Sequence, residues 1–264
     1  MSAEQDRIPT NMRMIFILEA LANAGRPLSV VELGETIDLP KPTLHRLCTT
    51  LEEDGFLIRD SIGGRLRPAR RTRVLASGLL MASQLHIGRR MVLTGLAAEL
   101  RETCNFVVPG ESGMTYLDRV DTPWPLRYQL PIGAEVPFHC TASGKLFLAS
   151  HDATGQDRLL RSMSLSMEGP NTIIDKDRLH SELSAIRQVG YSWDDEEFMA
   201  GMVAIAVPVH DPGKRFVAAL AFHAPTQRMK FEDAKQWVPR LKDAANQIEA
   251  LMFDEDTHAE AGAP

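Results

Sequence analysis

Hydrophobic residues recur every three or four positions in three successive stretches near the start of the chain, which is the spacing of amphipathic helices. The first stretch covers residues 12–24 and stops before a Gly-Arg-Pro break. The second begins at Ser29, where Glu32 completes a capping box. The third follows Pro40 and stops at Gly55, a natural C-cap. The pattern therefore predicts three short helices.

Two short strands are expected directly after these helices. Residues 56–59 and 65–67 have strand character and flank a turn signal at 61–64. Three short helices followed by a hairpin make a winged helix-turn-helix. We therefore assign residues 1–70 to a DNA-binding domain of this type.

A further helical pattern covers residues 72–82, and Gly88 is expected to end that helix. We therefore assign residues 71–88 to a linker helix. The biased composition of the last residues, 256–264, predicts a disordered tail.

Residues 89–255 form the second predicted domain. Hairpins at 105–120 and 203–223 outnumber strand–helix–strand units, so we expect a mostly antiparallel sheet with flanking helices. The whole chain is thus predicted to be an α+β protein. Helices of this domain are expected at 93–100, 142–150, 175–189 and 231–252.

Composition changes this picture only in its charge. Hydrophobic residues make up 44% and charged residues 24%, as in ordinary globular proteins, which excludes a fibrous or fully disordered chain. The net charge of −6 argues against a protein coated in basic surface. Residues 1–75, however, hold eleven basic and ten acidic residues, whereas the rest holds 18 and 25. Within residues 59–73 Asp60 is the only acidic residue, and six arginines form a basic strip: Arg59, Arg65, Arg67, Arg70, Arg71 and Arg73.

Three cysteines without short spacing favour neither a disulfide framework nor a zinc knuckle. They fit a reducing compartment. The chain shows no signal peptide and no apolar run of the ~20 residues that span a bilayer. We therefore expect a cytoplasmic protein with no membrane contact, no cofactor and no metal.

Side chains that contact phosphates and base edges gather on the third predicted helix, opposite its apolar face. A solvated helix face would explain each residue alone, but not their combination with the arginine hairpin. We therefore expect contact with a double-stranded DNA operator, by the helix at the major groove and by the hairpin at the backbone. The expected contact residues are Lys41, Pro42, Thr43, His45, Arg46 and Thr49 on the helix, with Arg65 and Arg67 on the wing.

The chain resembles the IclR (isocitrate lyase regulator) family of bacterial transcription factors over roughly residues 12–252. The resemblance rests on several motifs in order. It departs from the family where Leu-Arg-Pro-Ala (66–69) replaces the usual Tyr-x-Leu-Gly after the wing. The matching segments are LSVVELGETIDLPKPTLHRLCTTLEEDGFLIRD, YLDRV, GAEVPFHCTASGKLFLA, GYSWDDEEFMAG and IAVPVHDPGKRFVAALAFHAPTQRM.

The resemblance implies a GAF-like effector-binding domain and a set of ligand contacts. Relative to the family, Ala204 stands where a cysteine is frequent, and Ala221 and His223 stand where serines are frequent. The implied pocket floor is therefore more apolar and carries one imidazole. The contacts that the resemblance implies are Tyr128, Val136, Ala142, Ser143, Asp194, Met202, Ala204, Ala221 and His223.

The residues themselves support an acidic ligand group. Thr141–Lys145 opens a helix with small residues, and free N–H groups at a helix start attract negative charge. Plain capping explains the same residues equally well. The segment is not a Walker loop, because His139 stands at the first glycine position. An Asp194–His223 pair would favour the imidazolium and couple affinity to pH near neutrality.

Two other classes remain open at this point. An enzyme would use the carboxylates of residues 194–197, or His223 with Ser143, but no GxSxG or HExxH motif is present. A metal-responsive regulator would use His139, Cys140, Asp194 and His223, whose spacing requires no common site.

The favoured interpretation is a ligand-responsive regulator of a catabolic operon without catalytic residues. It would bind a palindromic operator and a small organic acid or aromatic catabolite. Two-fold operators require a two-fold protein, so we expect a homodimer or homotetramer. The helices predicted at 12–24 and 72–82 carry more apolar residues than one small domain can bury, so we place the dimer contact on them.

Overall fold

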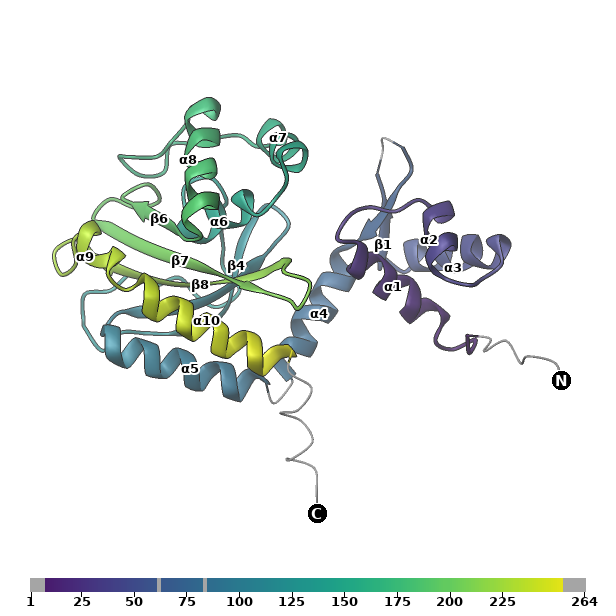
Figure 1. Ribbon diagram of the computed structural model, residues 1–264, viewed down its shortest axis with the longest axis horizontal. Helices are drawn as coiled ribbons and strands as arrows, with labels where there is room; N and C mark the ends of the chain where they lie inside the picture. Colours follow the sequence, from purple (N-terminus) through teal and green to yellow (C-terminus); the bar gives the residue numbers. More distant parts are fainter. Residues whose placement is uncertain (1–7, 61–62, 83–84, 254–264) are drawn as a thin grey trace, which may run out of the picture. The chain divides into compact units, whose positions relative to one another are not determined.

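The computed structural model describes residues 8–60, 63–82 and 85–253. The chain divides between residues 83 and 84 into two compact units (Figure 1). We call them the N-terminal unit and the C-terminal unit. The tail expected at 256–264 lies outside the described residues.

The N-terminal unit has the helices and the hairpin of a winged helix-turn-helix. Strands β1 and β2 pair antiparallel, and β2 also bridges to Leu28 through the backbone of Leu66. A buried cluster holds the unit together, with Ile17, Leu33 and Leu44 at most 1% exposed. The elements are α1 (Arg13–Ala24), α2 (Val30–Thr36), α3 (Lys41–Glu53), β1 (Leu57–Arg59), β2 (Leu66–Pro68) and α4 (Arg70–Ala82).

Local capping explains where these helices begin and end. Ser29 and Glu32 form the expected capping box at α2, with both hydrogen bonds present. Gly25 ends α1 in the left-handed conformation, at φ 60°, which costs glycine nothing. Pro40 is the N-cap of α3, where its missing N–H leaves no hydrogen bond unmade.

The C-terminal unit is built on a six-stranded sheet in the order β5-β4-β3-β8-β7-β6. Every pair of neighbouring strands in it is antiparallel, which confirms the predicted sheet type and the α+β class. The strands are β3 (Thr103–Pro109), β4 (Gly113–Val120), β5 (Glu135–Pro137), β6 (Ser192–Asp195), β7 (Met202–His210) and β8 (Phe216–Pro225).

Helices cover both faces of this sheet (Figure 1). The long pair α5 (Leu85–Leu100) and α10 (Val238–Phe253) packs on one face. On the other face α6 (Ala142–Ala149) lies against β6, β7 and β8, and α8 (Lys176–Val189) packs against α6. Two short helices complete the unit, α7 (Ala153–Ser162) and α9 (Phe231–Lys235). No helix among the described residues is long and apolar enough to cross a membrane.

Gly88 does not end a helix, contrary to the sequence prediction. It lies within α5, and a Cβ there would stand 3.2 Å from Cδ1 of Leu251 on α10. The glycine is therefore a close-packing position between two helices. The chain instead divides earlier, between residues 83 and 84.

The single helix predicted over 231–252 is also wrong. It is interrupted at Gln236 and Trp237, between α9 and α10. Pro239 lacks the N–H that a continuous helix needs and disfavours helical backbone in the residue before it. The proline therefore sits in the first turn of a new helix rather than in the middle of a long one.

Candidate functional site

The predicted DNA-contacting side chains of α3 form one exposed face. Leu44, Leu47, Cys48 and Leu51 point into the core of the N-terminal unit. The predicted residues occupy the other side: Lys41, Pro42, His45, Arg46 and Thr49 are exposed and Thr43 is half-buried. The helix therefore presents basic and hydroxyl groups to solvent over its N-terminal half, as a recognition helix does.

The wing arginines are already engaged within the unit. Arg65 donates to both carboxylate oxygens of Glu32, at 2.9 and 2.7 Å, and to the carbonyl of Pro27 at 3.2 Å. Arg67 donates to Asp60 at 3.0 Å. Hydrogen bonds to Glu32 from the Ser29 backbone, and from Arg26 and Arg65, hold the pKa of that carboxyl well below its usual range. Arg65 thus ties the wing to the start of α2.

The basic strip is therefore less bare than its sequence suggested. Glu32 and Glu52, remote in sequence, reach Arg65 and Arg59, the latter at 2.9 Å. Arg71 lies 4.4 Å over the ring of Phe56. The prediction that only Asp60 faces these arginines is wrong, because folding brings in acids from α2 and α3.

In the C-terminal unit, cross-strand pairing brings the implied ligand residues onto one face of the sheet. Asp194 pairs with Ala204, which pairs with His223. The next row contains Ser192, Ala206, Ala221 and Asn105. Directly paired residues point to the same side of a sheet. We call this face, together with the side chains of α6 that pack against it, the ligand layer, after the ligand contacts that the resemblance implies.

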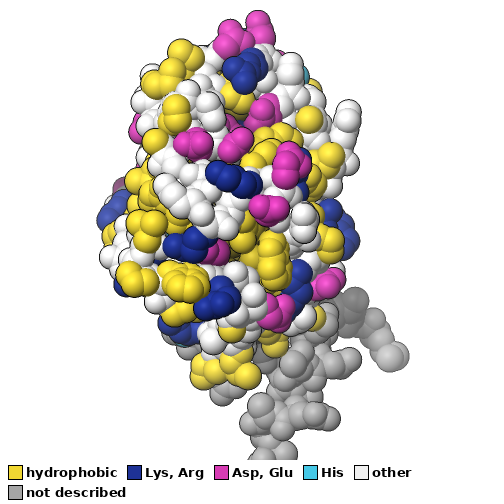
Figure 2. All heavy atoms as spheres, turned by 90° about the vertical axis from the view of Figure 1, so that its left-hand side faces the viewer, with side chains coloured by type: hydrophobic (Ala, Val, Ile, Leu, Met, Phe, Trp, Pro, Cys, Tyr) yellow, Lys and Arg dark blue, Asp and Glu magenta, His cyan; other side chains and the backbone are white. Residues whose placement is uncertain are grey.

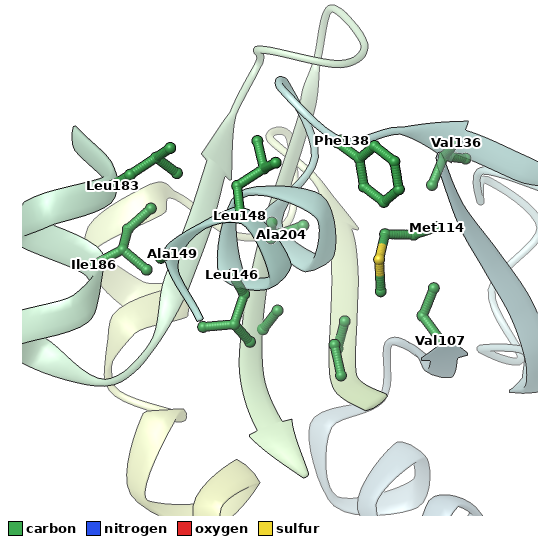
Figure 3. Close-up of a cluster of buried hydrophobic side chains, with 14 of the residues drawn as sticks. Val107, Met114, Val136, Phe138, Leu146, Leu148, Ala149, Leu183, Ile186 and Ala204 are labelled. Atoms are coloured by element: carbon green, nitrogen blue, oxygen red, sulfur yellow. The ribbon is translucent and has the colours of Figure 1, made fainter. Parts of the chain in front are cut away.

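Small methyl groups line the middle of the ligand layer. Ala204, Ala206, Ala219 and Ala221 belong to the same buried cluster as Ala142 and Leu146 of α6. Figure 3 shows larger side chains around this region, with Phe138, Met114, Val136 and Val107 on one side and Leu183 and Ile186 on the other. Met202 shares the alanine face two residues before Ala204, and Ser143 is buried on α6. The nine implied residues therefore lie in or directly over one layer.

His223 does not pair with Asp194, contrary to the expectation. Ala204 lies between them in the sheet, so two strand spacings separate the side chains. The imidazole instead contacts the Asn105 amide at 3.2 Å and the Tyr128 carbonyl at 3.3 Å. Burial, together with the positive charge of Arg119, lowers the pKa of His223 to about 4. The ring is therefore neutral at pH 7, and the predicted coupling of affinity to pH near neutrality is not supported.

Asp194 closes the turn that follows β6. Its Oδ1 accepts from the N–H groups of Glu197, at 2.7 Å, and Phe198, at 3.2 Å. Burial raises the pKa of this carboxyl to about 7, although those two bonds oppose the rise. Oδ2 has no partner among the described residues. The acidic run 194–197 is therefore not a solvated loop, since Asp194 and Glu197 are 1% and 4% exposed.

The loop of residues 121–134 covers the edge of the ligand layer near His223. Arg119 donates to Asp121 at 2.6 Å and to the Leu130 carbonyl at 3.0 Å, and also to the Tyr128 carbonyl. The Tyr128 hydroxyl donates to the Ala200 carbonyl at 3.0 Å. Tyr128 thus bridges from the loop to the turn after β6, above His223.

Asp118, the neighbour of Arg119 on β4, faces the opposite side of the sheet. Asp118 is 1% exposed and accepts from Arg90 at 2.8 Å and Arg89 at 3.4 Å, both on α5. His86 of the same helix lies 3.4 Å from it. Two consecutive residues of β4 therefore hold the covering loop and α5.

The start of α6 is capped and tightly packed. Thr141 accepts from the N–H of Gly144 at 3.1 Å. A Cβ on Gly144 would overlap the backbone of Phe138, so this glycine serves packing rather than ligand approach. Ala142 and Ser143 remain the first-turn residues whose N–H groups have no acceptor inside the helix.

Lys145 is a buried structural cation that sequence reasoning did not single out. It is fully buried, pairs with Glu182 and Glu197, and lies 5.5 Å over the Trp193 ring. Burial raises the pKa of Glu197 to about 8 despite Lys145. A lysine inside the apolar run KLFLA was the available signal, because a lysine placed on a buried helix face needs a partner.

The arrangement gives no support to a metal site or a catalytic pair. Among the residues that the structure describes, no three His, Cys, Asp or Glu side chains gather as metal ligands. His139 contacts the Ser166 carbonyl at 2.9 Å. His223 makes its hydrogen bonds to Asn105 and Tyr128 and not to Ser143.

Seen from the side of α9, the surface of the C-terminal unit mixes hydrophobic, basic and acidic side chains (Figure 2). This face is therefore no second basic surface for nucleic acid.

Comparison with known protein families gives two matches. The family described as the bacterial transcriptional regulator IclR C-terminal domain matches residues 80–250. The IclR helix-turn-helix domain matches residues 12–61. A relative, the probable transcriptional regulator SauR of Cupriavidus necator, is 37% identical and covers 90% of this chain and 94% of its own length.

Two solved structures share the fold. The IclR protein of Thermotoga maritima has a TM-score of 0.61 at 24% identity, over 91% of this chain and 97% of that one. An IclR homolog from Microbacterium hydrocarbonoxydans, solved in complex with 4-hydroxybenzoate, has a TM-score of 0.59 at 24% identity. That match covers 92% of this chain and 99% of the other.

Proposed function

Because this chain belongs to the IclR family of bacterial transcription regulators, we propose that it controls a catabolic operon in the cytoplasm. It binds a palindromic operator through the N-terminal unit and a small organic acid or aromatic catabolite in the C-terminal unit. The observation that carries the proposal is the ligand layer, in which a methyl-lined floor is bordered by buried polar side chains.

The DNA half of the proposal rests on the exposed face of α3. Arg46 and Lys41 stand in solvent on the half of the helix that enters the major groove in this motif. Arg65 and Arg67 stay near the wing backbone and serve phosphate contact, with their carboxylate partners fixing their position.

The ligand half rests on the chemistry of the layer. Ala204 and Ala221 offer no hydrogen bonds, so the ligand carries an apolar body. The first turn of α6, at Ala142 and Ser143, offers N–H groups and the positive end of a helix dipole to an acidic group. The Microbacterium relative binds an aromatic acid of this general kind.

A homodimer or homotetramer is part of the proposal. On α4, Val74, Leu75 and Leu79 are 58%, 47% and 62% exposed, and Ile15 of α1 is 46% exposed. A second copy of the chain would cover such apolar surface, and two winged helices read a palindromic site.

Fluorescence anisotropy with duplexes selected from a randomised library tests the proposal. The protein should bind selected duplexes at least a thousand times more tightly than random ones, and organic acids should change that affinity. Sedimentation should report a dimer or tetramer at micromolar concentration. Sequence-independent binding, or a monomer with full operator affinity, would contradict it.

The ligand site is tested by Ala142→Leu, which places a larger side chain at the start of α6. Calorimetry with the acids that shift the melting temperature should show weaker binding in this variant. Ala98→Leu, at an exposed position of α5 on the other face of the sheet, is the matched control. Equal affinity in Ala142→Leu and wild type would place the site elsewhere.

A further inference from the structure

Asn105 is a buried polar residue on the ligand face of the sheet. It lies on β3, is 1% exposed, and pairs with Ala221 on one side and Arg119 on the other. Since paired residues share a face, its side chain points into the ligand layer with the floor alanine Ala221. Neither the helical pattern nor the family motifs drew attention to it.

Two hydrogen bonds of His223 fix which way the amide of Asn105 points. The Tyr128 carbonyl oxygen only accepts, so the Nε2 of His223, 3.3 Å away, carries the hydrogen. In a neutral imidazole Nδ1 is then an acceptor. Asn105 therefore presents its NH₂ group to Nδ1, at 3.2 Å. The orientation follows from the network and not from the amide itself.

This orientation leaves the Oδ1 of Asn105 alone. It is buried and has no hydrogen-bond partner among the residues that the structure describes. A buried carbonyl oxygen without a donor is unfavourable and rare in native proteins. Ser192 and Asp194 also hold unpartnered oxygens in the layer, but a hydroxyl rotates and a carboxyl takes up a proton, so neither specifies its partner. An amide oxygen can only accept, and it specifies a donor.

We propose that Asn105 selects ligands that carry a hydroxyl or amino group, which donates to its Oδ1 across the alanine floor. The inference rests on the proposed ligand function and narrows its chemistry. Because α6 lies mainly over β6, β7 and β8 while Asn105 is on β3, the donor and the acidic group occupy different ends of the ligand. The ligand class is a small hydroxy or amino acid with an apolar body between its two ends.

Matched sets of three probes test the proposal. Each set contains a hydroxy acid, its analogue without the hydroxyl, and its methyl ether: 4-hydroxybenzoate, benzoate and 4-methoxybenzoate, and the corresponding butyrates. Calorimetry on wild type should show the hydroxy acid of at least one set binding about three- to ten-fold more tightly than both of its analogues, the range expected from one net hydrogen bond.

The variant Asn105→Leu separates the loss of one hydrogen bond from a general loss of ligand binding. It should remove the preference for the hydroxy acid, so that the ratio of the two affinities approaches one, while the analogue without the hydroxyl still binds. The exposed Asn246→Leu on α10 makes the same chemical change outside the layer and should keep the wild-type ratio. The same probes should bind more weakly to Ala142→Leu if they occupy the ligand layer.

The outcomes separate the two proposals. Binding in the layer without any preference for the donor, or a preference that survives in Asn105→Leu, overturns the inference and leaves the ligand function standing. A protein that binds no acid of any set overturns both.

Discussion

The exposed face of α3 and the ligand layer use polar side chains in opposite ways. On α3, His45 and Arg46 stand in solvent, on the side of the helix opposite the apolar residues that pack into the core. In the ligand layer, Asn105, His223 and Asp194 are each at most 4% exposed, and each touches the next element through a hydrogen bond. The polar side chains on the exposed face of α3 act independently of one another. In the ligand layer each polar side chain fixes the position of another through a hydrogen bond. Substitutions in the two regions should therefore differ in kind.

The largest difference is expected at Lys145. Lys145→Met leaves Glu197 buried without its cation, and breaking a buried ion pair costs about 3–5 kcal/mol. Because Lys145 lowers the pKa of Glu197, which burial raises to about 8, its removal raises that pKa further. The loss should therefore shrink as pH falls toward 8, where the carboxyl of the variant has taken up a proton, and change little below pH 8. Urea unfolding at pH 7, 8 and 9 measures both effects. Arg46→Ala on α3 should leave the free energy of unfolding within about 0.5 kcal/mol of wild type.

The pH dependence of stability should shift in opposite directions at two residues of the ligand layer. His223 has a folded pKa of about 4, below its unfolded value, so its contribution is complete above about pH 6.5 and is lost as pH falls to 4. Asp194 has a folded pKa of about 7, above its unfolded value, so its contribution is present below about pH 3.8 and is lost as pH rises to 7.

Relative to wild type, His223→Phe should therefore make stability fall more steeply as pH rises from 4 to 6.5. Over the same range Asp194→Asn should make stability rise with pH relative to wild type. Each change in slope is at most about 1.4 kcal/mol per pH unit. Thermal unfolding in a pH series gives both slopes, and changes of the same sign in the two variants would contradict the assignment. His45→Phe, on the exposed face of α3, serves as control.

Two helix glycines sharpen the comparison between the regions. Gly144→Ala forces a methyl group into the backbone of Phe138 and should cost about 1–3 kcal/mol. Gly34→Ala, on α2, meets only Cδ1 of Leu44 at 3.4 Å, an ordinary contact, and should be neutral or stabilising by about 0.5–1 kcal/mol. Calorimetric melting of both variants decides, and an equal loss at the two positions would show that packing does not separate these regions.

The smallest effects on folding and the clearest ones on recognition are expected at two arginines. Arg46→Ala should reduce discrimination among DNA sequences by about 1–3 kcal/mol, the worth of a base-edge contact. Arg65→Ala should weaken binding to all sequences about equally and lower the salt dependence. Isotherms on operator and random DNA at two salt concentrations test this. The same loss of specificity in both variants would mean that helix and wing are wrongly assigned.

Sequence reasoning predicted the first three helices of the N-terminal unit because their signals are local. The box at Ser29, the break at Pro40 and the glycine at position 25 each act within one turn, and the helix ends follow from them. Where the deciding contact is remote in sequence, the same reasoning was wrong: Leu251 explains why Gly88 lies inside a helix.

The candidate site divides in the same way. The family motifs brought together residues that share the ligand layer, because strand alternation carries the information about faces. The partners of His223 were missed, since Asn105 is 118 residues away and Tyr128 meets it through a loop. Short elements without strong periodicity, such as α7, β5 and β6, also escaped prediction.

One peptide unit on β4 has a mechanical consequence. Arg119 fastens the loop that covers the ligand layer, and Asp118 fastens the first turns of α5 on the reverse side of the sheet. The two side chains leave neighbouring residues of one strand in opposite directions, so the same short stretch of β4 backbone is the anchor of both the loop and the helix. A shift of the backbone at this point therefore displaces both anchors together.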